Sequence, residues 1–108
     1  MILDVEQLKK AIILWEIEKQ TKEQFLLNFN NYMVEQKEEF YSYFGEFKQG
    51  DLDYYIKKIS LELKNFPELN YIHLVSNLWV EYMGEVVGEY RLFFTLEGEV
   101  CDFDLIIF

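Results

Sequence analysis

The last third of the chain, residues 71–107, alternates between apolar and other side chains with a period of two. In the first segment, one parity holds Ile72, Leu74, Ser76, Leu78, Val80 and Tyr82. Successive side chains of a β-strand point to opposite faces, so this pattern predicts strands that bury one face. We expect a three-stranded antiparallel meander, with strands at about 71–83, 89–96 and 100–107.

Turn residues suggest how these strands pair. The dipeptide at 97–98 is a candidate two-residue turn, since its glycine readily adopts positive φ. It would set Leu92 against Phe103 and keep the apolar faces in phase. In the first hairpin a two-residue loop would lose that phase. A three-residue loop at 84–86, or a bulge at Gly88, would restore it.

The mixed face of the predicted sheet carries the candidate binding residues. They are Trp79, Glu81, Glu89, Arg91, Phe93, Asp102 and Asp104. The predicted register puts Trp79, Arg91 and Asp104 in one row, so Arg91 would pair with Asp104 and lie over the indole ring. Exposed aromatic rings framed by carboxylates and one arginine are typical of a protein–protein interface. An ordinary solvated face with one surface salt bridge is the alternative interpretation.

Three amphipathic segments precede the sheet. They predict helices at about 4–18, 21–44 and 51–66. Capping-box patterns begin the first two, at Asp4 and Thr21, and Asp51 would cap the third. Helices followed by strands predict a single α+β domain over residues 1–108, with the three N-terminal helices packed on one face of the sheet.

The face that these helices cover decides which surface is free. If they cover the mixed face, the acidic residues Glu35, Glu38 and Glu39 of the second helix become the better candidates. If the sheet wraps, it would enclose an aromatic-lined pocket, with His73 or Asp102 pointing into it.

The charge of the chain limits its partners. Ten Lys and Arg residues against twenty Asp and Glu residues give a net charge of −10. Nucleic acids and anionic membranes are polyanions, and they are therefore poor direct partners. The charge favours a basic protein partner, or it serves solubility alone.

No catalytic, metal or cofactor motif is recognisable in the sequence. Its one cysteine, Cys101, excludes an internal disulfide and is expected in the core from its parity. His73 is the single histidine, and no glycine-rich phosphate loop is present. The N-terminus lacks the features of a signal peptide, and the longest apolar run, 11–15, is too short to span a bilayer. We therefore expect a cytoplasmic protein without a cofactor and without enzymatic activity.

Four stretches of the C-terminal third support a resemblance. They are 78–84 (LWVEYMG), 87–92 (VGEYRL), 96–100 (LEGEV) and 102–105 (DFDL). In style this acidic meander resembles the small, acidic, cytoplasmic immunity proteins of bacterial contact-dependent and polymorphic toxin systems. Those families are diverse and offer no shared functional residues to carry over. The resemblance implies stoichiometric binding to a toxin domain, often a basic nuclease, and coverage of its active site.

Two other classes of function stay open at the level of the sequence. An acidic decoy inhibitor of a nucleic-acid enzyme, of the phage type, would carry evenly spaced carboxylates along one surface. A small-molecule-binding or enzymatic domain would need a cavity between the second helix and the sheet. A compact mixed patch around Trp79 and Arg91 instead favours the immunity protein.

Overall fold

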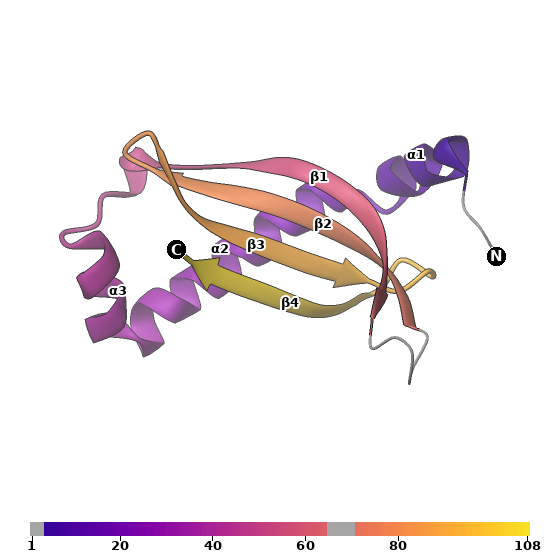
Figure 1. The fold of residues 1–108 in the computed structure, drawn as a ribbon. Coiled ribbons are helices and arrows are strands. Elements are labelled where there is room, and N and C mark those ends of the chain that lie inside the picture. Colours follow the sequence, from indigo (N-terminus) through magenta and orange to yellow (C-terminus); the bar gives the residue numbers. More distant parts are fainter. Residues whose placement is uncertain (1–3, 65–70) are drawn as a thin grey trace.

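The computed structural model describes residues 4–64 and 71–108, which form one helical layer and one antiparallel sheet (Figure 1). The helices are α1 (Val5–Leu14), α2 (Ile17–Glu35) and α3 (Lys37–Phe44), followed by a short 3-10 helix, η1 (Gln49–Asp51). The strands are β1 (Leu52–Lys64), β2 (Tyr71–Tyr82), β3 (Glu85–Phe94) and β4 (Val100–Ile107). Helices followed by an antiparallel sheet confirm the α+β class. The strands lie in the sheet in chain order, but there are four of them and not three.

The additional strand is the segment predicted as a third helix, and that prediction is wrong. Leu52–Lys64 pairs with β2 along its whole length. A register shift at Lys57 inserts one residue, which puts Ile56 and Ile59 on the same face of the strand. Their spacing of three therefore fits a helix and a bulged strand equally well. The long hairpin with β2 decides between them, because pairing and packing override local propensity.

The helix boundaries also differ from those expected. The capping box of Asp4 is confirmed, since its carboxylate accepts the Gln7 amide at 2.8 Å. Glu16 adopts a left-handed conformation with φ of 50°, which separates α1 from α2. The second helix therefore starts at Ile17 and not at a Thr21 cap. A further break at Gln36 divides the expected single helix 21–44 into α2 and α3.

Thr21 has a different role, inside α2. Its hydroxyl donates to the Ile17 carbonyl oxygen at 2.6 Å and lies 2.8 Å from the Ser76 hydroxyl of β2. Both residues are fully buried. A buried polar group needs a partner, so this contact fixes how α2 sits along the sheet.

The core lies between α2, α3 and one face of the sheet. Phe25 and Phe29 of α2 are fully buried, as are Tyr90 and Phe94 of β3. The Phe25 ring centre is 5.6 Å from that of Tyr90, in an edge-on arrangement. Burial of such a side chain contributes about 1.5–3 kcal/mol, so aromatic residues of α2 and β3 supply much of the stability.

The β3–β4 pairing matches the expected register in its centre. Leu92 faces Phe103, as predicted. The connection, however, is a three-residue loop, 96–98, closed by a hydrogen bond from the Thr95 amide to the Glu99 carbonyl at 2.8 Å. Gly98 takes the positive φ, 89°, that this loop type requires.

The β2–β3 hairpin contains a bulge, but the extra residue is Val87 and not Gly88, and the alternative three-residue loop is not formed. Tyr82 faces Glu85 across a two-residue turn, and a register shift between Val80 and Glu81 restores the phase. The strand β3 therefore begins at Glu85, earlier than the predicted residue 89. The apolar faces match as expected because the extra residue on β3 returns the alternation to its original face.

Gly98 also allows a close contact between the β3–β4 loop and the helical layer. A Cβ atom at this position would lie 2.7 Å from the ring of Trp15, whereas one at Gly84 would have nothing within 4 Å. Both glycines have positive φ, so Gly84→Ala measures the backbone cost alone. We expect Gly98→Ala to lower the free energy of unfolding by about 2–4 kcal/mol and Gly84→Ala by about 1 kcal/mol in urea titrations. Equal losses would show that the Trp15 contact does not constrain the loop.

Candidate functional site

The helix α2 packs along one face of the sheet and leaves the other face open over the described residues (Figure 1). We call this second surface the open face. All of the predicted binding residues belong to it. Trp79 and Glu81 come from β2, Glu89, Arg91 and Phe93 from β3, and Asp102 and Asp104 from β4. The helices therefore do not cover the candidate patch, which was one of the possibilities left open by the sequence.

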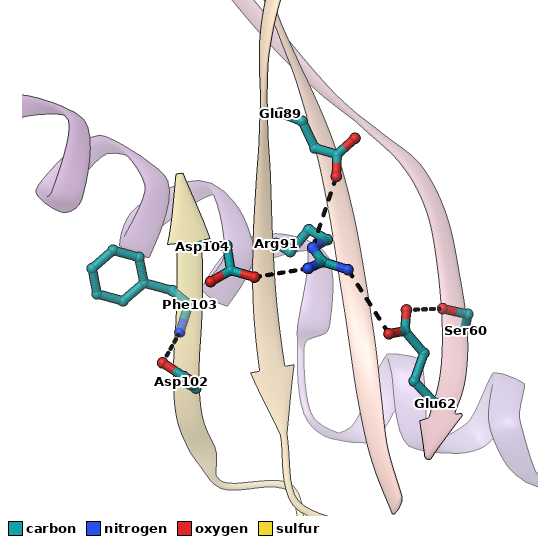
Figure 2. Close-up of polar contacts among 7 residues, drawn as sticks. All are labelled: Ser60, Glu62, Glu89, Arg91, Asp102, Phe103 and Asp104. Atoms are coloured by element: carbon teal, nitrogen blue, oxygen red, sulfur yellow. Dashed lines mark hydrogen bonds and ion pairs between the residues drawn. The ribbon is translucent and has the colours of Figure 1, made fainter. Parts of the chain in front are cut away.

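Arg91 lies at the centre of the open face, among three carboxylates (Figure 2). Its guanidinium donates to Asp104 at 2.8 Å, which confirms the predicted pair. Glu62 of β1 and Glu89 lie on its other sides, each with an oxygen 3.8 Å from a guanidinium nitrogen. One cation shared by three carboxylates leaves this cluster with an excess of negative charge.

The aromatic partner of Arg91 differs from the prediction. Arg91 faces Asn77 and Asp104 across the strands, so it is not in the row of Trp79. Its guanidinium carbon lies 5.3 Å from the centre of the Phe93 ring instead. The cation over Trp79 is Lys57, at 4.8 Å. The shift of two residues in the β2–β3 register explains this exchange.

Phe93 cannot anchor a partner in the way expected of an exposed ring. Its exposed fraction is 3%, and that of neighbouring Val75 is 1%, although both lie on the open face. Arg91 covers the Phe93 ring, and His73 packs edge-on against it at 6.2 Å. The accessible aromatic part of the predicted patch is therefore Trp79, which is half-buried.

Residues of β1 complete the open face, and the sequence analysis missed them. Tyr55 donates from its hydroxyl to Glu81 at 3.0 Å, and this hydrogen bond raises the pKa of Tyr55. Lys57 and Glu62 contact Trp79 and Arg91, as described above. Since 51–66 was predicted as a helix, no register placed these side chains beside the patch. The bulge pattern in 52–64 is the only sequence signal that could have done so.

A second surface lies along the far side of β4. A groove of about 380 Å³ separates this strand from α2 and α3. It is lined by Asn28, Asn31, Tyr32, Glu35, Gln36, Glu39, Tyr43, Phe103, Leu105 and Ile107. Of the alternative candidates Glu35, Glu38 and Glu39, the first and the last line this groove and Glu38 does not. The floor is apolar, because Phe103, Leu105 and Ile107 point to the side of the sheet that the helices cover.

Tyr32 is the polar group most constrained within this groove. Its hydroxyl oxygen is buried and has no hydrogen-bond partner among the described residues. Burial raises the pKa of Tyr32, and the nearby Glu39 carboxylate raises it further. The side-chain oxygen of Asn28, another residue lining the groove, accepts a hydrogen bond from the Tyr90 hydroxyl at 2.6 Å.

Among the described residues, no cavity opens between the middle of α2 and the sheet, where a ligand-binding or enzymatic domain was expected to have its pocket. Between α2 and the sheet the space is filled by Phe25, Phe29, Tyr90 and Phe94. His73 and Asp102 were expected to point into such a cavity, but they do not line the groove, and their strand positions put them on the open face. Cys101 is also exposed and not in the core, because the register shift between Phe93 and Phe94 makes it the extra residue of a bulge.

No cluster of candidate metal ligands occurs within residues 4–64 and 71–108. None of the helices in these ranges is long and apolar enough to cross a membrane. No protein-family model, curated protein or solved structure matches this chain. The case for function therefore depends on the two surfaces themselves.

The Arg91 cluster gives a direct test of the electrostatics of the open face. Arg91→Met is expected to lower the free energy of unfolding by about 1–2 kcal/mol, because three carboxylates then lose their shared cation. The loss should shrink at high NaCl concentration, where the remaining repulsion is screened. Lys58→Met, an exposed cation in the same row, serves as the control and should cost about 0.5 kcal/mol or less. Equal losses for both variants in urea titrations would rule out a special role for Arg91.

Proposed function

We propose that this chain is an immunity-type inhibitor that binds a basic bacterial toxin domain, such as a nuclease, and covers its active site. The observation that carries the proposal is the open face, a sheet surface that the described helices leave free and that holds an excess of carboxylates around Trp79 and Arg91. A nuclease binds a polyanion, so its active-site cleft presents basic side chains. An acidic, solvent-facing sheet is complementary to such a cleft.

The charge pattern of the open face favours this function over the acidic decoy. A nucleic-acid mimic needs carboxylates in an uninterrupted series, because it imitates a row of phosphates. On the open face Lys57 lies over Trp79, and Arg91 lies between Glu89 and Asp104. A mixed patch of this kind suits one specific protein surface, because its cations must also find partners.

Trp79 is the proposed anchor of the contact. It is half-buried and flanked by Lys57, so part of the indole is available while its position is already fixed. Tryptophan residues held in this way often dominate binding energy, because little conformational freedom is lost on association. The carboxylates around it would then steer the approach and set the orientation of the partner.

Co-expression with the toxin tests the proposal in cells. The toxin to test is the C-terminal domain of a large secreted protein, if the gene just upstream of this chain encodes one. We expect the wild-type chain to restore growth of a bacterial host that expresses this domain, and Asp102→Lys combined with Asp104→Lys to abolish the rescue. Glu6→Lys with Glu38→Lys changes the net charge equally on exposed positions of the helical layer and should keep the rescue.

The purified complex tests the physical basis. Its association rate should fall about tenfold or more when NaCl is raised from about 50 mM to about 500 mM, because steering between opposite charges is screened. Circular dichroism of each variant would separate a lost contact from a lost fold. No rescue by the wild-type chain, or an association rate that ignores salt, would contradict the proposal.

A further inference from the structure

In the part of the chain that the structure describes, no strand pairs with the outer side of β4, and a side chain caps an outward amide near the start of this edge. β4 is the last strand of the sheet, so alternate backbone groups along it face away from β3. The Asp102 carboxylate accepts the outward amide of Phe103 at 2.8 Å (Figure 2). The other edge has the same device, where Asp53 accepts the Tyr54 amide at 2.9 Å. Each edge thus satisfies one amide with its own side chain and blocks pairing at that point.

Within the described ranges, no such side-chain cap is found on the outward amides in the second half of β4. The amide of Phe108 donates to Val87 of β3, so the amides two and four residues earlier also face β3. The amides of Leu105 and Ile107 therefore point outward, with no strand beside them in the part of the chain that the structure describes. This second half of β4 is the half that borders the groove.

The helical layer reaches past this edge. In Figure 1, α2 crosses behind the sheet and its C-terminal end, followed by α3, emerges beyond β4. Strand β4 is thus the border of the sheet but not of the helical layer. A strand added beside β4 would have α2 and α3 beneath it, and its inward side chains would enter the groove.

The charges around the edge define what such a strand must carry. On the groove side, the carboxylates of Glu35 and Glu39 would receive its inward side chains, beside the Tyr32 side chain that also lines the groove. On the open face, Asp102 and Asp104 would flank its outward side chains. The exposed Phe103 and Ile106 add an apolar contact on each side of β4. Lysine and arginine side chains, with long apolar stems and charged ends, match this combination.

A second copy of the chain is a poor occupant. An edge-to-edge pair of β4 strands centred on Leu105, whose amide points outward, would set Asp104 of each copy opposite Ile106 of the other. The two Asp104 carboxylates would then be diagonal neighbours on one face of the joined sheet, where like charges repel. Two chains of net charge −10 would also repel at longer range. The same carboxylates attract a basic strand, so charge complementarity selects a different protein.

We propose that a Lys- or Arg-rich segment of the partner pairs with the outer edge of β4 as a fifth strand of the sheet. This segment inserts one basic side chain into the groove between Glu35, Glu39 and Tyr32. Backbone hydrogen bonds to the unpaired edge supply affinity, and the groove selects the side chain. This inference rests on the proposed function for the nature of the partner. The edge itself is testable without the toxin.

The probe is a synthetic peptide of about eight residues that alternates lysine and valine, the length of a typical strand. Its control has the same charge but is N-methylated at alternate residues, which removes the donors for pairing with an edge. Binding to the full chain is measured by calorimetry, and amide hydrogen exchange is followed by NMR. We expect the probe to bind, the control to bind about tenfold more weakly or less, and the exchange of Leu105 and Ile107 to slow about tenfold or more in the complex.

Charge reversal in the groove provides the second arm. Glu35→Lys with Glu39→Lys should weaken the probe about tenfold or more. Glu23→Lys with Glu38→Lys is the matched control, with one change on α2 and one on α3 at exposed positions outside the groove, and should leave binding within about twofold.

Four results would overturn the inference. They are absence of binding, equal binding of the N-methylated control, resonance shifts on the open face without protection of Leu105 and Ile107, and a dimer of the free chain that already protects these amides. Rescue by the wild-type chain combined with any of these results would leave the proposed function standing and move the contact to the open face alone. If the wild-type chain gives no rescue but the peptide binds as expected, the proposed function is contradicted and the binding of a basic strand at the β4 edge still stands.

Discussion

The packing of α2 on one face of the sheet is the interaction on which the rest of the structure depends. The buried Phe25 ring packs against Tyr54 of β1 and Tyr90 of β3, and Phe29, also buried, packs against Phe25 and against Phe40 and Phe44 of α3. The buried contact between Thr21 and Ser76 fixes the position of the helix, because a slide along its axis would separate the two hydroxyls. No other helix contacts the sheet as extensively, so the orientation of α2 decides which strands are covered.

Both candidate surfaces follow from that arrangement. One layer of helices covers one side of the sheet, so the polar side chains of the open face find their partners among themselves. These contacts are the Arg91 cluster, the Lys57–Trp79 contact and the Tyr55–Glu81 hydrogen bond. Because α2 crosses the strands obliquely, it also leaves a groove beneath β4. A small domain thus carries two acidic surfaces that meet along a single strand.

The two surfaces differ in the contact they can make. The open face is preorganised, since Arg91 and Phe93 are held by neighbours before any partner arrives. Preorganised charge favours fast, oriented encounter. The β4 edge instead offers unpaired backbone and an apolar floor, which favour a slowly dissociating contact through main-chain hydrogen bonds. Since Asp102 and Asp104 border both, one partner could use the open face for approach and the edge for retention.

The sequence by itself determined the alternation of β2, β3 and β4, the apolar side of each, the Asp4 cap and the Arg91–Asp104 pair. These features depend on neighbours that are close in sequence or joined by short turns, where a period of two is unambiguous. Only the tertiary structure decided that 52–64 is a strand, because its bulged spacing also fits a helix and the pairing with β2 lies outside the segment. It likewise decided the register of β2 with β3, the burial of Phe93 and the groove beneath β4. Each of these features depends on the position of a single inserted residue or on the path of α2. Local periodicity in the sequence predicts neither that position nor that path.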